Sequence, residues 1–160
     1  KLFRLGTLYC QSKVWLKLID CQTNISGHEP AFYTKLLTRL ESQLEILYEE
    51  GARSFLFLTV PPTDRAPLFL QQGSQVAKRL HALIADYNSQ LATMVKNFET
   101  KHKDLDQVTV FDTQPIFNTL LDNANALGFV NVTGWCDAYQ NGTPEKTTQI
   151  KPCAPVSSYL

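Results

Sequence analysis

An excess of charge and a long apolar run are both missing from this sequence. Fifteen Lys and Arg residues balance fifteen Asp and Glu residues, which leaves a formal net charge of zero. The chain therefore has no overall positive field to attract nucleic acid or an anionic membrane surface. No apolar stretch approaches the ~20 residues that cross a bilayer. We expect a monomer that binds neither nucleic acid nor membrane.

Several short motifs of known chemistry are also absent. The sequence contains no P-loop, no Gly-x-Ser-x-Gly, no Gly-x-Gly-x-x-Gly and no His-Glu-x-x-His. The four cysteines show no Cys-x-x-Cys spacing, so we expect neither a metal site nor a cofactor. His81 and His102 have no carboxylate partner that the sequence identifies. Each is predicted to be a surface or boundary residue and not a catalytic one.

What is present is the composition of an ordinary globular chain, with 44% hydrophobic and 19% charged residues. We expect residues 1–160 to form one domain. The stretch Ser54–Val60 (SFLFLTV) is apolar without alternation, and Pro61-Pro62 follow it. This pattern predicts a strand buried on both faces, as in the middle of a parallel sheet.

Helical periodicity flanks this strand on both sides. One helix is predicted from Glu29-Pro30 to a stop at Gly51, and another over Ser74–Lys101, because apolar residues recur at intervals of three and four. A further strand, Val108–Asp112, precedes a shorter helix that begins at Thr113. The order of elements predicts an α/β domain with a parallel sheet.

The loop Pro61–Pro67 follows the carboxyl end of the predicted central strand. Ligands of open parallel sheets collect at that edge, so this loop either faces a site or is a stiff linker. Asp64 and Arg65 are accordingly either substrate contacts or a local ion pair. Asp112 ends the next strand, where catalytic carboxylates often lie, but we favour a role in capping the helix that follows.

Residues 123–160 are predicted to form an irregular lobe, since Asn, Gly, Thr and Pro occur densely in them. A bridge between Cys136 and Cys153 would close a loop of about 17 residues and staple the lobe. The pairing of Cys10 and Cys21 stays open. Asn-x-Ser/Thr glycosylation sequons stand at three positions, Asn24, Asn131 and Asn141. Sequons and cysteines together favour an oxidising, secreted setting.

Several stretches, taken in order, resemble one family of esterases. They are Tyr48–Arg53 (YEEGAR), the central strand with Pro61-Pro62, Asp64–Pro67, Tyr87-Asn88, Val110–Asp112, Gly128-Phe129, Cys136, Tyr139–Gly142, Cys153 and Pro155–Tyr159. In order and spacing they are similar to the fungal secreted GDSL, or SGNH-hydrolase, esterases, above all the acetyl esterases that act on decorated plant polysaccharides. The resemblance covers residues 29–160.

The resemblance implies a three-layer α/β/α domain with a parallel sheet, of the SGNH-hydrolase or flavodoxin-like type, incomplete here at both ends. It implies acyl transfer through a serine in a Gly-Asp-Ser motif, with a histidine as base and preorganised donors around the oxyanion. The substrate would be a small-molecule or carbohydrate ester.

The sequence departs from that family at its reactive positions. Gly-Asp-Ser is absent. A Gly-x-Asn-Asp oxyanion motif would fall at Gly6, in a predicted strand over Lys1–Leu8, but Leu8 and Tyr9 replace its Asn and Asp. The chain stops at Leu160, about where the family continues into its histidine segment. We expect the central portion of an esterase, whose nucleophile and base lie outside this chain.

Two other functions stay open. Aromatic side chains could stack on sugar rings in a non-catalytic carbohydrate-binding protein, and the candidates are Trp15, Trp135, Tyr139 and Tyr159. Alternatively, the chain is an inactive remnant of the esterase fold, with apolar faces left uncovered.

Overall fold

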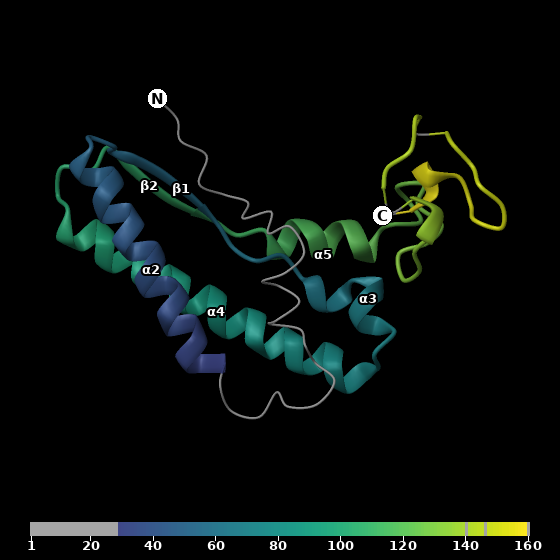
Figure 1. Cartoon of the computed structure of the whole chain (residues 1–160), viewed down its shortest axis with the longest axis horizontal. Coiled ribbons are helices and arrows are strands. Elements are labelled where there is room, and N and C mark those ends of the chain that lie inside the picture. Colours follow the sequence, from purple (N-terminus) through teal and green to yellow (C-terminus); the bar gives the residue numbers. More distant parts are fainter. Residues whose placement is uncertain (1–28, 140, 146, 160) are drawn as a thin grey trace. The chain divides into compact units, whose positions relative to one another are not determined.

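The structure is a computed structural model, and it describes residues 29–139, 141–145 and 147–159 (Figure 1). The described residues form two compact units. The first comprises residues 29–59 and 85–112, and the second comprises 60–84 and 113–159. The predicted single domain over residues 1–160 stays a prediction. Several predicted features lie outside the described residues: the strand Lys1–Leu8 with Gly6, and Cys10, Trp15, Cys21 and Asn24.

Helix α2 (Glu29–Glu49) begins where Glu29-Pro30 predicted it and ends two residues before the predicted glycine. Gly51 has a φ of 94°. Its N–H donates to the carbonyl of Tyr48 at 3.0 Å, and the N–H of Ala52 donates to the carbonyl of Leu47 at 2.9 Å. These two bonds make a Schellman motif, which needs a left-handed residue after the helix. The predicted stop at Gly51 is confirmed.

Two parallel strands, β1 (Ser54–Leu58) and β2 (Gln107–Phe111), pair in register from Ser54 opposite Gln107 to Leu58 opposite Phe111. Helix α4 (Ser74–Lys101) lies between them in the sequence, as a crossover between parallel strands requires. The parallel pairing confirms the predicted α/β class.

The core of the first unit lies on one face of this strand pair. Phe55 and Phe57 point into it from β1. Figure 1 shows α2 and α4 on the same side of the strands, and both supply the opposing side chains. Leu44 of α2 and Phe98 of α4 are the most deeply buried, at 0% and 1% exposure. The remaining buried members are Leu37, Leu91, Met94 and Val95.

The other face of the strand pair differs from prediction. Leu56 is 46% exposed, and Leu58 and Phe111 are also exposed. β1 therefore alternates between buried and exposed side chains, and the prediction of burial on both faces is wrong for the described part of the chain. An unbroken apolar run fixes a strand but not which of its faces is covered.

The second unit contains short elements and one long irregular segment. Its elements are η1 (Thr63–Arg65), α3 (Pro67–Leu70), the first turns of α4, α5 (Gln114–Asp122), η2 (Asp137–Tyr139) and η3 (Val156–Ser158). After α5, the chain makes an isolated parallel bridge between Asn131 and Tyr159. Over the described residues, no helix combines the length and apolarity that a bilayer crossing demands.

Candidate functional site

The carboxyl ends of β1 and β2 are joined by Thr59 and Asp112. The Thr59 N–H donates to the carbonyl of Phe111 at 3.1 Å, and the Thr59 hydroxyl donates to Asp112 Oδ1 at 3.0 Å. Thr113 stands at the N-cap position of α5 and makes no side-chain capping hydrogen bond, so the capping role favoured for Asp112 stays a prediction. The carboxylate of Asp112 also ties the two strand ends together.

In the second unit, Gln114 fixes the segment that follows β1. Its Nε2 donates to the carbonyl of Val60 at 2.7 Å. The Pro61-Pro62 pair comes next, and the latter is buried. The start of α5 therefore holds the chain just before η1, the turn that contains Asp64 and Arg65.

Asp64 and Arg65 do not pair with each other, so the local ion pair considered for them is wrong. Arg65 reaches α5, where Nη1 donates to Asn118 Oδ1 at 2.8 Å and Nη2 lies 2.6 Å from Asp122 Oδ1. The spacing of Asn118 and Asp122, four residues apart, places both on one helix face. That spacing was a signal in the sequence for a shared partner. Arg65 is a structural link between η1 and α5.

Asp64 instead pairs with α4. Its Oδ2 lies 3.2 Å from Nδ1 of His81. The Asp64 side chain is 12% exposed and the imidazole is 68% exposed. His81 is a surface residue as predicted, but it does have a carboxylate partner, which the sequence did not identify. A carboxylate at Nδ1 fixes the orientation of an imidazole, and by itself supplies neither a nucleophile nor an oxyanion donor.

Two oxygens of η1 are buried without a hydrogen-bond partner among the described residues: Asp64 Oδ1 and Thr63 Oγ1. An unsatisfied buried acceptor costs about 1–3 kcal/mol, so such atoms normally meet a donor or an ordered water. Asp64 therefore keeps one buried oxygen without a partner among the described residues, whereas both terminal nitrogens of Arg65 are bonded to α5.

The first unit contains a second carboxylate–imidazole pair that sequence reasoning missed. His102 Nε2 lies 3.0 Å from Glu45 Oε2, and Lys101 Nζ donates to Glu45 Oε1 at 2.8 Å. The His102 ring also packs on Tyr48, with ring centroids 3.8 Å apart. His102 is therefore a boundary residue, as predicted, and it has a carboxylate partner that the sequence did not identify.

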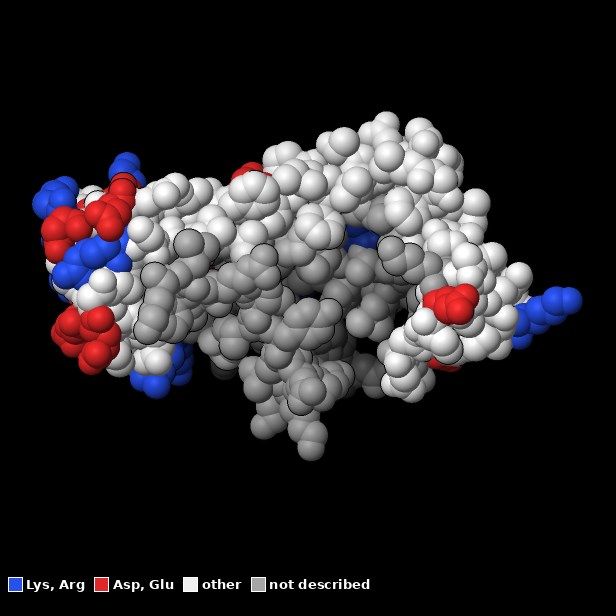
Figure 2. All heavy atoms as spheres, turned by 90° about the horizontal axis from the view of Figure 1, so that it is seen from above, with Lys and Arg blue, Asp and Glu red and all other residues white. Residues whose placement is uncertain are grey.

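The same network continues to the residues next to the strands. The Arg53 guanidinium lies 4.1 Å from the centre of the Tyr48 ring, and its Nε donates to Asp104 Oδ2 at 2.9 Å. The Tyr48 hydroxyl also donates to Asp104. This network lies at the amino ends of β1 and β2, opposite the edge where parallel sheets bind ligands. Its role is structural, and Figure 2 shows charged side chains gathered at this end of the unit.

Hydrogen bonds in this network lower the pKa of two carboxyl groups. The Lys101 ammonium, with a further contribution from His102, lowers the pKa of Glu45 below its ordinary value of 4.5. The hydrogen bond from Tyr48, with the Arg53 charge, lowers the pKa of Asp104 below 3.8. The fold therefore favours the ionised form of both carboxyl groups more strongly than the unfolded chain does.

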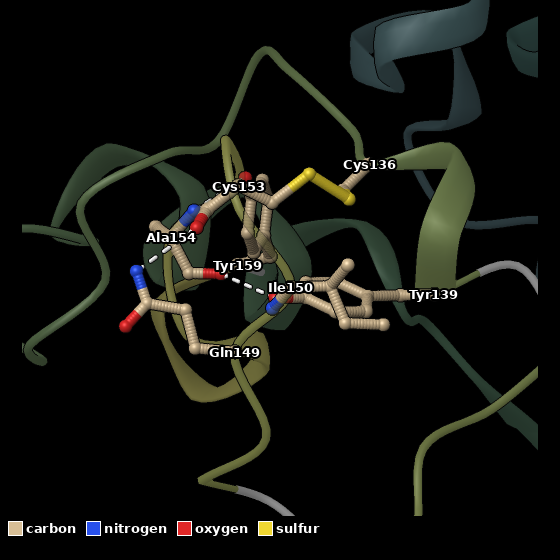
Figure 3. The surroundings of a disulfide bond; sticks show 7 residues. All are labelled: Cys136, Tyr139, Gln149, Ile150, Cys153, Ala154 and Tyr159. Carbon is tan, nitrogen blue, oxygen red and sulfur yellow. Dashed lines mark hydrogen bonds between the residues drawn. A yellow bond between two sulfur atoms is a disulfide. The ribbon is translucent and has the colours of Figure 1, made fainter.

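In the lobe, the predicted bridge between Cys136 and Cys153 is confirmed (Figure 3). Beside it, two tyrosine hydroxyls form hydrogen bonds with backbone that belongs to no strand. The Tyr139 hydroxyl donates to the carbonyl of Ala154 at 2.7 Å and accepts the N–H of Ile150 at 3.0 Å. The Tyr159 hydroxyl accepts the N–H of Ala154 at 3.3 Å. Tyr139 is therefore a structural residue, and Trp135 is the more exposed of the described aromatic candidates.

A groove of about 510 Å³ opens on the lobe. Phe129 and Tyr159 are its aromatic walls. The Tyr159 ring packs edge to face on Tyr139 at 6.0 Å, which fixes its orientation. The other lining residues include two with hydroxyl groups and one with a carboxylate, and they are Thr143, Pro144, Glu145, Val156 and Ser157. Aromatic faces beside hydroxyl and carboxylate groups suit a neutral, polyhydroxylated ring.

Of the remaining predicted site residues, some lie among the described residues and some lie outside them. Asn131 and Asn141 both lie in the lobe, the former half-buried and the latter exposed. Gly6 and Asn24 lie outside the described residues. In the described ranges, no group of three or more His, Cys, Asp or Glu side chains is placed to hold a metal ion.

Comparison with known proteins identifies the family. The profile of the GDSL-like lipase/acylhydrolase family matches residues 19–148. An acetylesterase of Thermothelomyces thermophilus is 39% identical over 92 residues, which are 57% of this chain and 30% of that protein. A GDSL esterase/lipase of Arabidopsis thaliana is 30% identical over 112 residues, 67% of this chain and 30% of that protein.

A thermolabile hemolysin of Vibrio parahaemolyticus is 26% identical over 90 residues, 56% of this chain and 21% of that protein. The chain thus spans less than a third of the length of each of these relatives. The family match includes both strands and all the long helices, which accords with the predicted three-layer α/β/α fold. The chain belongs to the GDSL-like lipase/acylhydrolase family.

Proposed function

We propose that this chain is part of a carboxyl-ester hydrolase that removes acetyl groups from carbohydrate esters derived from plant polysaccharides. The observation that carries the proposal is the family match over residues 19–148, on a chain whose β1 and β2 pair in parallel. The identity to an acetylesterase supports the acyl group. The sugar part of the substrate is supported by the finer resemblance to fungal secreted esterases.

The setting of the protein is part of the same proposal. A disulfide in an irregular lobe is typical of secreted proteins. Three sequons agree with that setting. We infer a secreted, monomeric protein whose partner is a small-molecule or carbohydrate ester, with no need for a cofactor.

The described residues supply the scaffold and not the bond-breaking groups. Acyl transfer needs a nucleophile, a base within hydrogen-bond reach of it, and donors for the oxyanion. Gly-Asp-Ser does not occur in this sequence. Of the two imidazoles with carboxylate partners, His102 lies in the structural network and His81 pairs with Asp64. In this proposal, the nucleophile and the base come from other polypeptide.

The test compares this chain with the same chain extended by the polypeptide encoded on either side. We expect no turnover of 4-nitrophenyl acetate by the 160 residues alone, and serine-dependent turnover, with labelling by a fluorophosphonate, for the extended form. Turnover by the short chain would refute the missing nucleophile. An extended form that folds, yet neither turns over nor is labelled, would refute the esterase.

The groove favours a second function, non-catalytic carbohydrate binding. Its aromatic walls, Phe129 and Tyr159, and the nearby carboxylate of Glu145 match what sugar rings require. Titration with xylo-oligosaccharides, followed by isothermal titration calorimetry, tests this function. Saturable heat of binding that Glu145→Ala weakens supports it, and the absence of binding heat at millimolar sugar removes it.

A further inference from the structure

Two of the three sequons lie among the described residues, and the structure treats them differently. N-glycosylation attaches a bulky, hydrated group to the side-chain nitrogen of asparagine, so that nitrogen needs open space in the folded protein. Asn131-Val132-Thr133 and Asn141-Gly142-Thr143 both satisfy the sequence rule. The tertiary surroundings of their carboxamides separate them.

The side chain of Asn131 is part of the fold. Its Oδ1 accepts the N–H of Thr133 at 3.2 Å and the N–H of Gly134 at 2.6 Å, which makes an Asx-type turn. The backbone at Asn131 is fixed as well, because its N–H donates to the carbonyl of Ser158 at 3.2 Å. This carboxamide cannot rotate outward without breaking both turn bonds.

The nitrogen of this carboxamide lies directly against the backbone of Gly134. A Cβ built on Gly134 would be only 2.6 Å from Asn131 Nδ2. If one methyl-sized atom does not fit beside Nδ2 on that side, a sugar bonded to Nδ2 is still more crowded. A glycan on Asn131 therefore competes with the turn that this residue forms.

Asn141 occupies the opposite kind of environment. It is exposed and lies in a turn whose next residue, Gly142, has a φ of 86°. The Gly142 N–H donates to the carbonyl of Tyr139 at 2.9 Å, which anchors the turn through its backbone. A Cβ built on Gly142 would meet nothing within 4 Å. The space beside this turn is open.

We propose that Asn141 is the N-glycosylation site of the lobe and that Asn131 stays unmodified. In this step, Asn141 Nδ2 bonds to C1 of the reducing-end sugar of a lipid-linked oligosaccharide. The bond from C1 to the lipid diphosphate breaks, the diphosphate leaves, and the carboxamide loses one proton. The inference rests on the secreted setting proposed above and is independent of esterase activity.

The test uses the whole chain with a host leader, secreted from yeast, in an Asn24→Gln background that removes the undescribed sequon. Intact mass is measured before and after treatment with peptide-N-glycosidase F, and the glycopeptide is mapped. We expect one glycan on the parent chain. Asn141→Gln and Thr143→Ala should each abolish it.

Matched variants at the other sequon serve as controls. Thr133→Ala destroys the sequon but keeps the turn, because Asn131 accepts from the backbone and not from the Thr133 hydroxyl. Asn131→Asp also keeps an acceptor oxygen. Both variants should retain the glycan mass of the parent chain.

The proposal is overturned by a glycan mapped to Asn131, or by an unmodified Asn141 in secreted chain whose peptide map contains the Cys136–Cys153 disulfide. The disulfide-linked peptide shows that the lobe has formed its bridge in the material that is scored. An inactive extended esterase leaves the glycan result unchanged, so failure of the proposed activity and failure of this site are distinguishable.

Discussion

At the scale of single residues, side chains in the lobe supply the hydrogen bonds to the backbone that neighbouring strands supply in a sheet. The carbonyl and the N–H of Ala154 bond to the hydroxyls of Tyr139 and Tyr159 respectively. Buried backbone polar groups must find partners, and a segment without regular structure cannot supply them from its own ladder. Tyrosine hydroxyls fill that need because they can donate and accept at once.

Replacing Tyr139 by Phe should therefore destabilise the lobe. The variant keeps the ring but leaves the Ala154 carbonyl and the Ile150 N–H without their partner. Because these groups are partly exposed, we expect a loss of about 0.5–1.5 kcal/mol in the free energy of unfolding. Urea unfolding followed by Trp135 fluorescence, in a Trp15→Phe background, measures it.

The control is Tyr159→Phe, which removes one longer bond, that from the Ala154 N–H. It should cost less than Tyr139→Phe. Equal and negligible losses in the two variants would show that these hydroxyls do not hold the lobe.

Glu45 gives a prediction about pH. Its pKa is lowered in the folded chain, chiefly by Lys101, so the ionised form stabilises the fold. That contribution is present above the ordinary pKa of 4.5 and is lost as the pH falls through the lower, folded-state pKa. Glu45→Gln should be less stable than the parent chain near neutral pH. The difference should shrink as the pH falls below 4.5 and disappear below the lowered, folded-state pKa.

Urea midpoints across that pH range test this expectation. Glu99→Gln, on an exposed position of α4 outside the network, is the matched control. It should follow the parent curve throughout. A gap between Glu45→Gln and the parent chain that stays constant down to acid pH would contradict the assigned charge pairing.

At the scale of elements, η1 is a joint that contacts two helices through adjacent residues. Asp64 pairs with His81 of α4, and Arg65 pairs with Asn118 and Asp122 of α5. Asp122 is the last residue of α5. A carboxylate there is unfavourable, because the carboxyl end of a helix carries partial negative charge. The Arg65 guanidinium offsets that cost.

A double-mutant cycle between Arg65→Ala and Asp122→Ala measures this link. We expect a coupling of roughly 0.2–1 kcal/mol that weakens with salt, since both groups are partly exposed. Asp122→Ala alone should be close to neutral, because it removes the carboxylate from the helix end. A coupling of zero at low salt would show that the Arg65–Asp122 pair does not stabilise the contact between η1 and α5.

Helix ends and strand positions in this chain follow from local sequence. Gly51 ends α2 because only a left-handed residue completes the Schellman bonds there. α4 has the predicted bounds, Ser74–Lys101, and β2 differs from its prediction by one residue at each end. Local signals of this kind depend on neighbours within a few residues, and the sequence displays those directly.

At the scale of the whole molecule, the strand pair has one packed and one exposed face in the described part of the chain. This contrast gives a test with two neighbouring residues. Leu56→Thr should change the free energy of unfolding by no more than about 0.5 kcal/mol, because the side chain is exposed and Thr suits a strand. Phe57→Ala should cost about 3–5 kcal/mol, because it opens the core.

Urea unfolding monitored by circular dichroism compares the two variants. A loss of several kcal/mol for Leu56→Thr would mean that this face is covered in solution. It would contradict the exposure of Leu56 on β1. A small loss for Phe57→Ala would place the core elsewhere.

The amino-acid sequence by itself determined the elements, the α/β class, the disulfide and the resemblance to GDSL esterases. All of these rest on periodicity, on residues with special backbone needs and on motif order. The tertiary structure alone decided which groups meet: Asp64 with His81, 17 residues apart, and Glu45 with His102, 57 residues apart. It also decided which face of β1 is packed. Such pairings depend on how elements stack in space, and the pattern within one element carries no record of its partner.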